Sequence, residues 1–245
     1  MNVLLTGGTS GLGLAMAKAL ATAGATVALT GRSGSRAEAV AAELPGALGI
    51  ELDVRDAASV AAAVDRAWSR LGGIDLLVNN AGIGMNTVNP RFMTEPQGFW
   101  HVPVDGFRAV VDTNLTGYFL VAREVVPRML AAGHGRIVNI STSLPTMRRA
   151  GFVPYGPSRA GSEALSRVMA ADLKDTGVTV NVLLPGGATF SGMLSREDVP
   201  AGQRVLEPEV MGPPIVWLAS DKAAGVHDER IIAAEFDQWL RDRQD

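Results

Sequence analysis

The chain has 245 residues, of which 47% are hydrophobic and 19% charged, and its formal net charge is −3 at pH 7. This composition is typical of a globular protein with a large core, and the near-neutral charge excludes the basic excess of a nucleic-acid-binding surface. The absence of cysteine excludes disulfides, thiolate metal sites and cysteine nucleophiles. Because His101, His134 and His227 lack the spacing of metal ligands, we expect no metal site.

The first apolar run of the sequence, Val3–Leu5, is too short for a signal peptide or a membrane span. We therefore expect a cytoplasmic protein without membrane or nucleic-acid partners.

Apolar runs alternate with helical segments along the chain. The predicted strands are Val3–Thr6, Thr26–Thr30, Leu48–Leu52, Ile74–Val78, Arg136–Ile140, Val178–Leu184 and Arg230–Ala233. The predicted helices are Leu14–Ala23, Arg36–Leu44, Ala57–Leu71, Val104–Ala132, Tyr155–Thr176 and Pro208–Ser220, with Gly84–Gly98 as a loop. This alternation is typical of an α/β fold with a parallel sheet and helices on both faces. We predict one doubly wound, Rossmann-like domain over residues 1–245, because no linker or repeat interrupts the pattern.

A glycine-rich turn, Thr6-Gly7-Gly8-Thr9-Ser10-Gly11-Leu12-Gly13, joins the first predicted strand to the first helix. Glycines there allow a tight turn and a close approach to a pyrophosphate, and the helix start offers free N–H groups. Since the strand and the helix flank the turn in the required order, the sequence predicts a dinucleotide site rather than an ordinary turn.

Further motifs follow in a recognisable order: Asn79-Asn80-Ala81-Gly82, Asn114, Tyr155-x-x-x-Arg159, and Asn181 with Pro185-Gly186. Together with the Gly-x-x-x-Gly-x-Gly spacing, they make the chain up to Ala233 resemble the short-chain dehydrogenase/reductase family. The resemblance implies a nicotinamide cofactor and an oxidoreductase that interconverts small-molecule carbonyls and secondary alcohols. The implied cofactor-binding residues are Gly7, Thr9, Ser10, Gly11, Leu12, Gly13, Arg32, Asp53, Val54, Asn80, Ala81, Gly82, Tyr155, Arg159, Pro185, Gly186 and Ala188.

The residues after the second strand select between the two nicotinamide cofactors. An acidic residue at this position pairs with the ribose hydroxyl of NAD, whereas here Gly31-Arg32 follows Thr30. A guanidinium can bind a phosphate with two hydrogen bonds, so we predict NADP(H), with NAD(H) as the alternative if Arg32 is merely solvated. Ser33 and Arg36 could assist Arg32. The resemblance places Asp53 and Val54 at the adenine, although Asp53 could instead cap the helix that starts near Ala57.

Tyr155 and Arg159 are four residues apart on a predicted helix and therefore share one face. The resemblance implies that the tyrosine hydroxyl exchanges a proton with the substrate oxygen, helped by a neighbouring positive charge. Arg159 replaces the family's lysine. Arginine keeps the charge but does not readily give up a proton, so we expect an impaired proton relay.

A second hydroxyl is implied on the loop after the fifth strand. The family spacing of thirteen residues before the tyrosine falls on Thr142, while a loop deletion would favour Ser143. Asn114 would help to orient the residue at position 159, or it could be a buried polar group that bends its helix.

The substrate side departs from the family pattern. The family's threonine for the nicotinamide carboxamide has no clean equivalent, and Thr189 and Ser191 flank its position. The long segment Gly84–Pro103 carries Phe92, Phe99, Trp100 and His101, which could contact substrate or pack at a surface or subunit contact. Arg148-Arg149 could bind an acidic substrate or be solvated, and Phe236, Trp239 and Leu240 near the C-terminus need cover from the chain or a subunit.

Two functional hypotheses follow. The first is an NADP(H)-dependent oxidoreductase with Asn114, Thr142, Ser143, Tyr155 and Arg159 as its candidate catalytic residues, working as a homodimer or homotetramer. The second is a dinucleotide-binding sensor or scaffold with little catalysis, suggested by Arg159 and the missing threonine. Tyr155 favours the first.

Overall fold

The computed structural model of the chain describes residues 1–194, 199, 202 and 204–243. Seven parallel strands form one sheet in the order β3-β2-β1-β4-β5-β6-β7. The strands are β1 (Asn2–Leu5), β2 (Thr26–Gly31), β3 (Leu48–Glu51), β4 (Leu76–Asn79), β5 (Gly135–Ile140), β6 (Val178–Leu184) and β7 (Arg230–Ile232). The helices are α1 (Gly11–Thr22), α2 (Gly34–Ala42), α3 (Ala57–Leu71), α4 (Val104–Val111), α5 (Gly117–Ala132), α6 (Leu144–Met147), α7 (Tyr155–Asp172), α8 (Gly212–Ala219) and α9 (Phe236–Asp242).

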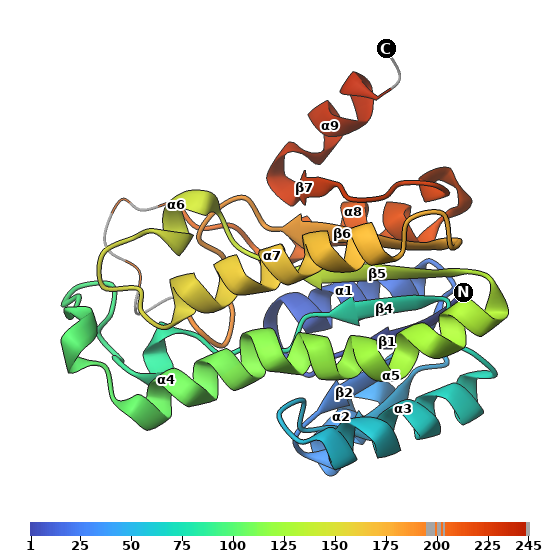
Figure 1. Cartoon of the computed structure of the whole chain (residues 1–245), viewed down its shortest axis with the longest axis horizontal. Helices are drawn as coiled ribbons and strands as arrows, with labels where there is room; N and C mark the ends of the chain where they lie inside the picture. The colour runs from blue at the N-terminus through green and yellow to red at the C-terminus, as the bar shows by residue number, and fades with distance from the viewer. Residues whose placement is uncertain (195–198, 200–201, 203, 244–245) are drawn as a thin grey trace.

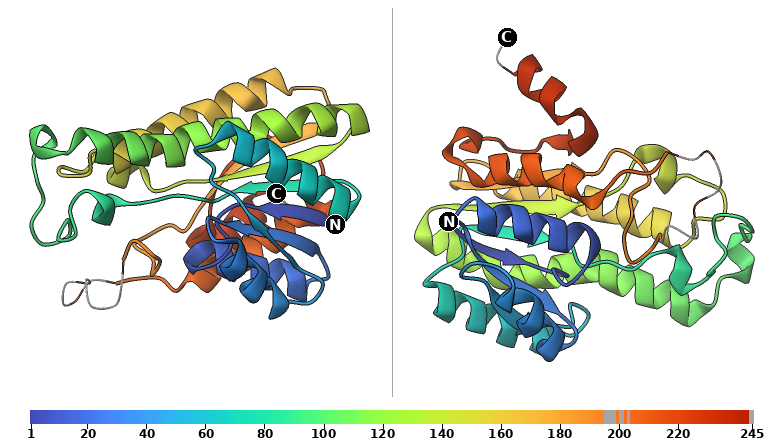
Figure 2. Two further views of the ribbon diagram at one scale, coloured as in Figure 1. Left: turned by 90° about the horizontal axis from the view of Figure 1, so that it is seen from below. Right: turned by 180° about the vertical axis from the view of Figure 1, so that it is seen from behind.

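Helices cover both faces of the sheet, which confirms the predicted Rossmann-like α/β fold (Figure 1; Figure 2). Successive residues of a strand point to opposite faces, so β1 contributes to two separate cores. Val3 and Leu5 pack in the core formed with α1, α2 and α8. Leu4 packs in the other core, with α3, α5 and the end of α7.

The predicted long helix over Val104–Ala132 is interrupted. A π-helical turn, Asp112–Thr116, separates α4 from α5. Helix α5 ends at Ala132, as predicted, and Gly133 follows it with φ 76° in the left-handed region. Asn114 lies in the π-turn, where the extra residue redirects a side chain. Nothing in the helical periodicity of the sequence marks this break.

Other differences from the predicted elements are smaller. The last helix before β6, α7, ends at Asp172, four residues earlier than predicted, and the segment Pro208–Met211 is a 3-10 turn that precedes α8. A short helix, α6, occupies part of the connection between β5 and α7, for which the sequence pattern predicts no element.

The chain itself covers the C-terminal aromatic residues. The Trp217 ring on α8 lies 5.9 Å from that of Phe236 and 5.3 Å from that of Trp239, measured between centroids. Leu240 also packs on the core beside α8. Among the described residues, no helix has the length and apolar character that crossing a membrane requires.

Because all strands are parallel, their carboxyl ends meet at one edge of the sheet, and this edge is where ligands bind in open α/β sheets. The glycine turn after β1 and the segments after β4, β5 and β6 all line one cavity there.

Candidate active site

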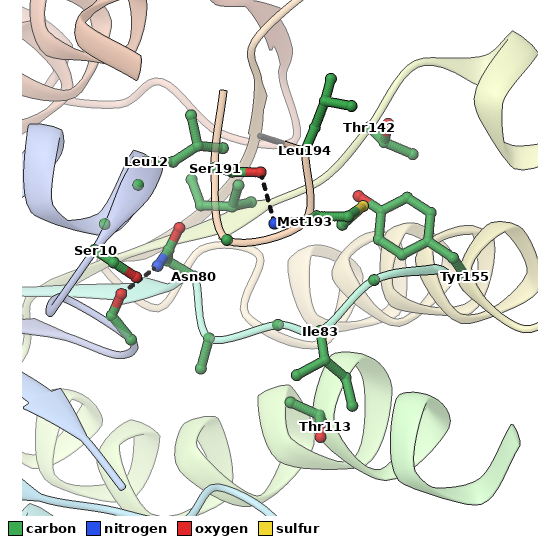
Figure 3. Close-up of a pocket in the computed structure, with 18 of the residues that line it drawn as sticks. Ser10, Leu12, Asn80, Ile83, Thr113, Thr142, Tyr155, Ser191, Met193 and Leu194 are labelled. Carbon is green, nitrogen blue, oxygen red and sulfur yellow. Dashed lines mark hydrogen bonds between the residues drawn. The ribbon is translucent and has the colours of Figure 1, made fainter. Parts of the chain in front are cut away.

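A cavity of about 660 Å³ lies at this edge, within the range of small-molecule and cofactor sites. Figure 3 shows its two ends. Ser10 and Leu12 of the glycine turn lie at one end, and Thr142 and Tyr155 lie together at the other, with Met193 between them.

The glycine turn has the backbone geometry of a phosphate cradle. Gly7 and Gly11 have φ values of 67° and 53°, which L side chains rarely adopt. A Cβ on Gly13 would lie 2.1 Å from the carbonyl oxygen of Gly7, so this close crossing requires glycine. Helix α1 begins here, and within the described chain its N-cap residue Ser10 makes no side-chain capping hydrogen bond. These residues fit a pyrophosphate bound at the start of α1.

Thr6 and Asn80 fasten this turn to the segment after β4. The Thr6 hydroxyl oxygen accepts hydrogen bonds from the backbone N–H groups of Asn80 and Ala81, each at 3.0 Å. The Asn80 side chain donates to the carbonyl oxygens of Thr6 and Gly7, each at 3.0 Å. Asn80, Ala81 and Gly82 line the cavity as expected, whereas the sequence motifs assign the Thr6 hydroxyl no role.

Arg32 is exposed and lines the cavity beyond the glycine turn. A Cβ on Gly31 would lie 2.8 Å from a methyl carbon of Thr9, so the end of β2 and the turn are in direct contact. Ser33 is the N-cap of α2, because its hydroxyl accepts a hydrogen bond from the Arg36 N–H at 3.3 Å.

Asp53 and Val54 also line the cavity. The Asp53 carboxylate accepts from the Arg55 Nε at 2.9 Å, and this hydrogen bond holds the pKa of Asp53 below its ordinary value. The prediction that Asp53 could cap the following helix is wrong, because Asp56 is the N-cap of α3 and accepts from the N–H groups of Ala58 and Ser59.

Only one of the two predicted hydroxyl donors lines the cavity. Thr142 faces it at the end where Tyr155 lies (Figure 3). Ser143 is absent from the described cavity lining and is the N-cap of α6, where its hydroxyl accepts from the Thr146 N–H at 3.3 Å. Ser141 is buried and donates to Glu163 at 2.6 Å.

Tyr155 is the first residue of α7, and Arg159 follows one turn later, with both side chains buried on the cavity wall. The Arg159 Nη1 donates to the Tyr118 hydroxyl at 2.8 Å and to the Ile140 carbonyl oxygen at 2.9 Å. Burial acts to lower the pKa of Arg159, but the adjacent oxygens of Tyr118 and Tyr155 outweigh it and hold that pKa above its ordinary value. Arg159 is therefore a permanent cation beside Tyr155.

Asn114 is fully buried and holds the segment after β4. Its oxygen accepts from the Ile83 N–H at 2.9 Å, and its nitrogen donates to the Ile83 carbonyl at 2.9 Å and to Ser158 at 3.0 Å. The side chain thus links the π-turn, the cavity wall and α7.

The turn after β6 contributes Pro185, Ala188, Thr189 and Ser191 to the cavity. Gly186 is absent from the described lining; with φ 101° it lies against β7, where a Cβ would be 2.7 Å from Ile232. The two hydroxyls that flank the position of the family's threonine each make a hydrogen bond within this turn. Thr189 donates to the Gly187 carbonyl, and Ser191 accepts from the Met193 N–H.

An apolar wall stands beside Tyr155. Phe92 and Phe152 meet edge to face at 5.7 Å between ring centroids and pack with Met85 and Leu194. Phe99 and Trp100 differ from Phe92, since their exposed fractions are 68% and 71%.

Arg149 lies at this wall and lines the cavity, with its guanidinium 4.7 Å from the Phe152 ring centroid.

Within the described part of the chain, no group of three or more histidine, aspartate or glutamate side chains is arranged to hold a metal ion.

Tyr118 carries no family motif, yet it contacts the guanidinium that replaces the family lysine. It lies four residues after Asn114, beyond the π-turn, and is the only tyrosine besides Tyr155. A buried tyrosine hydroxyl usually has a hydrogen-bond partner. Because the chain has only two tyrosines, the presence of Tyr118 near Asn114 was the one signal in the sequence that could have pointed to it.

Comparisons with known proteins agree with this fold. A model of the family described as short chain dehydrogenase matches residues 1–199. The chain is 34% identical to a 3-oxoacyl-(acyl-carrier-protein) reductase of Aquifex aeolicus over 93% of both chains. It is 38% identical to a 2-dehydro-3-deoxy-L-rhamnonate dehydrogenase (NAD(+)) of a Sphingomonas species, over 76% of this chain and 71% of that protein.

A solved structure has the same architecture. The 3-ketoacyl-(acyl-carrier-protein) reductase of Brucella melitensis, complexed with NADH, superposes with a TM-score of 0.82 and 29% identity. The match covers 94% of this chain and 95% of the other.

Proposed function

Since the chain belongs to the short-chain dehydrogenase/reductase family and is an oxidoreductase of that family, we propose that it interconverts a carbonyl and a secondary alcohol with NADP(H) as cofactor. One observation carries the proposal. Tyr155 and Thr142 lie at one end of the cavity whose other end is the glycine turn, and the Arg159 guanidinium lies 5.4 Å from the Tyr155 ring centroid.

A nicotinamide bound between these ends would supply or accept the hydride. In the reducing direction, the Tyr155 hydroxyl gives its proton to the substrate oxygen, and in the oxidising direction the phenolate takes it back. The Thr142 hydroxyl donates a hydrogen bond to the same oxygen, and Arg159 stabilises the phenolate through its charge. The apolar wall of Phe92 and Phe152 excludes water from this end.

The preference for NADP(H) rests on Arg32. No acidic residue follows β2, and Arg32 lines the cavity where the adenosine ribose would lie. NAD(+) and NADH appear in the names of two proteins similar to this chain, and these names describe those proteins. For this chain, the choice between the two cofactors is argued from Arg32.

Equilibrium titration of the purified protein with NADPH and with NADH, followed by nicotinamide fluorescence, tests the cofactor assignment. Tighter binding of NADPH supports it. Tighter binding of NADH overturns the argument from Arg32, and binding of neither overturns the role of the glycine turn.

The alternative of a sensor or scaffold without catalysis is not favoured. The relatives named above are reductases and dehydrogenases, and Tyr155 keeps a place at the cavity that binding alone would not require.

We also propose that the protein is a cytoplasmic homo-oligomer. Phe107, Phe119 and Val168 expose 40%, 46% and 57% of their surfaces on α4, α5 and α7. A second copy that presents the same face would cover them, and this makes a homodimer the smallest assembly we expect. Sedimentation of Phe119→Glu against the unchanged protein tests it: loss of the dimer supports this face, and an intact dimer refutes it.

A further inference from the structure

The side chain of Arg159 sits in a place that is demanding for a guanidinium. It is 5% exposed, and no carboxylate of the described residues forms an ion pair with it. Its Nε has no hydrogen-bond partner among the described atoms. A buried cation is costly unless polar groups surround it, so the few acceptors that it does have must fix its position.

Two such acceptors lie beside one guanidinium nitrogen, Nη1. The Tyr118 hydroxyl and the Ile140 carbonyl oxygen both accept from Nη1, at 2.8 and 2.9 Å. The Tyr118 hydroxyl also donates to the Ile140 oxygen at 3.0 Å, so the three groups form a closed triangle. Burial raises the pKa of Tyr118 above its ordinary value, and the phenol therefore keeps the proton that it donates.

The other terminal nitrogen of the guanidinium, Nη2, lies at the cavity wall. A Cβ on Gly82 would lie 2.4 Å from the Arg159 Nη2, so this nitrogen reaches the cavity wall at Gly82. The guanidinium carbon lies 5.4 Å from the centroid of the Tyr155 ring and 5.6 Å from that of the Tyr118 ring. Arg159 is thus placed between one tyrosine that anchors it and one that borders the substrate end.

A phenylalanine at position 118 would keep the packing of the ring, so the hydroxyl of Tyr118 must serve another purpose. The side chain is 1% exposed, and its oxygen bonds within the triangle, to the Ile140 carbonyl and the Arg159 guanidinium. A lysine at position 159 would carry a single nitrogen at the end of a flexible chain, whereas a planar guanidinium must also be held at the correct tilt.

We propose that Tyr118 is a positioning residue for Arg159: its hydroxyl fixes the guanidinium so that the charge faces Tyr155 and Nη2 faces the cofactor side of the cavity. This inference rests on the proposed function. It also explains how the chain accommodates arginine where the family has lysine.

The test compares four proteins: the unchanged chain, Tyr118→Phe, Arg159→Lys and the double variant. For each, the dissociation constant of NADPH and the pH dependence of kcat and KM for a carbonyl–alcohol pair are measured. With Arg159 present, we expect Tyr118→Phe to lower kcat about tenfold with little change in KM, because small misplacements of a catalytic group are costly. The half-maximal rate of alcohol oxidation should move to higher pH, since a displaced cation stabilises the phenolate less.

In the Arg159→Lys background, the same loss of the hydroxyl should change kcat and NADPH binding by less than about twofold. Ser166→Ala is the matched control, because it removes a different buried hydroxyl, which lies on α7 and has Ser162 and Asn139 as its partners. It should lower stability without moving the pH profile.

Equal effects of Tyr118→Phe in the two backgrounds, in both rate and NADPH binding, would overturn the proposal. A chain that binds NADPH but turns over no substrate would instead contradict the proposed function. The coupling between positions 118 and 159 in NADPH binding would then decide the positioning role alone, with Tyr118→Phe expected to weaken binding only beside Arg159.

Discussion

The guanidinium of Arg230 donates a hydrogen bond of 2.9 Å to the carbonyl oxygen of Thr142, which ties β7 to the loop that carries the proposed hydroxyl donor. The same guanidinium pairs with Glu163 of α7 at 3.0 Å. Glu163 in turn accepts from Ser141 at 2.6 Å. The hydroxyl loop, α7 and the last strand are therefore held by one partly buried polar network.

Removing Arg230 should weaken both the fold and the site. Its side chain is 20% exposed and that of Glu163 is 14% exposed, so Arg230→Met leaves a poorly hydrated carboxylate and should cost about 3 kcal/mol of unfolding free energy. Urea denaturation measures this loss. Adding Glu163→Gln should recover part of it.

Arg91→Met serves as the control for Arg230, because it breaks the well-exposed Arg91–Glu95 pair and should leave the urea midpoint nearly unchanged. An equal shift for both arginine variants would show that the network is no more than a surface contact.

Substitutions of the neighbouring residues Thr142 and Ser143 should affect different properties of the protein. Thr142→Val should lower kcat by about tenfold or more, since it removes a donor aimed at the cavity. Ser143→Ala should cost about 1 kcal/mol of stability through the lost cap of α6 and leave kcat within about twofold. Steady-state kinetics and thermal unfolding of both variants make the comparison, and the reverse pattern would transfer the proposed role to Ser143.

Arg32→Ala should change cofactor choice more than the rate of the chemical step. We expect NADPH to bind at least about tenfold more weakly, because a phosphate contact is lost, while the affinity for NADH changes little. Fluorescence titration with each cofactor measures both constants. If both affinities fell equally, Arg32 would not contact the 2′-phosphate.

The glycine turn should tolerate no side chain at its crossing point. Gly13→Ala places a Cβ 2.1 Å from the Gly7 carbonyl oxygen, so the backbone must move and NADPH binding should be lost. Gly192→Ala is a matched control on the same cavity, because no described atom outside its two chain neighbours lies within 4 Å of the added Cβ. Retained NADPH affinity in Gly13→Ala, measured by the same titration, would exclude this turn as the phosphate cradle.

The fold was predictable because strand runs, helical segments and the glycine turn are local patterns. The π-turn at Asn114 was not, since it depends on the contacts of Asn114 with Ile83 and Ser158, which are distant in sequence. The helix α3 has the predicted bounds, Ala57–Leu71, so its cap is Asp56, the residue directly before Ala57, and Asp53 lies three residues too early for that position.

In the site, motif spacing identified Tyr155 and Arg159 but left Thr142 and Ser143 undecided. The start of α6 separates these two residues, because Ser143 is used as its cap. Tyr118 carried no motif, and its contact with Arg159 joins α5 to α7 across the fold.

Tyr155→Phe tests the central claim most directly. Turnover of a carbonyl or alcohol substrate and the dissociation constant of NADPH are measured in the variant and in the unchanged protein. The proposed function predicts a loss of kcat of about 10²-fold or more, because the proton donor is gone, with NADPH affinity largely retained. Unchanged turnover in Tyr155→Phe would contradict the assignment of Tyr155 as the general acid and base.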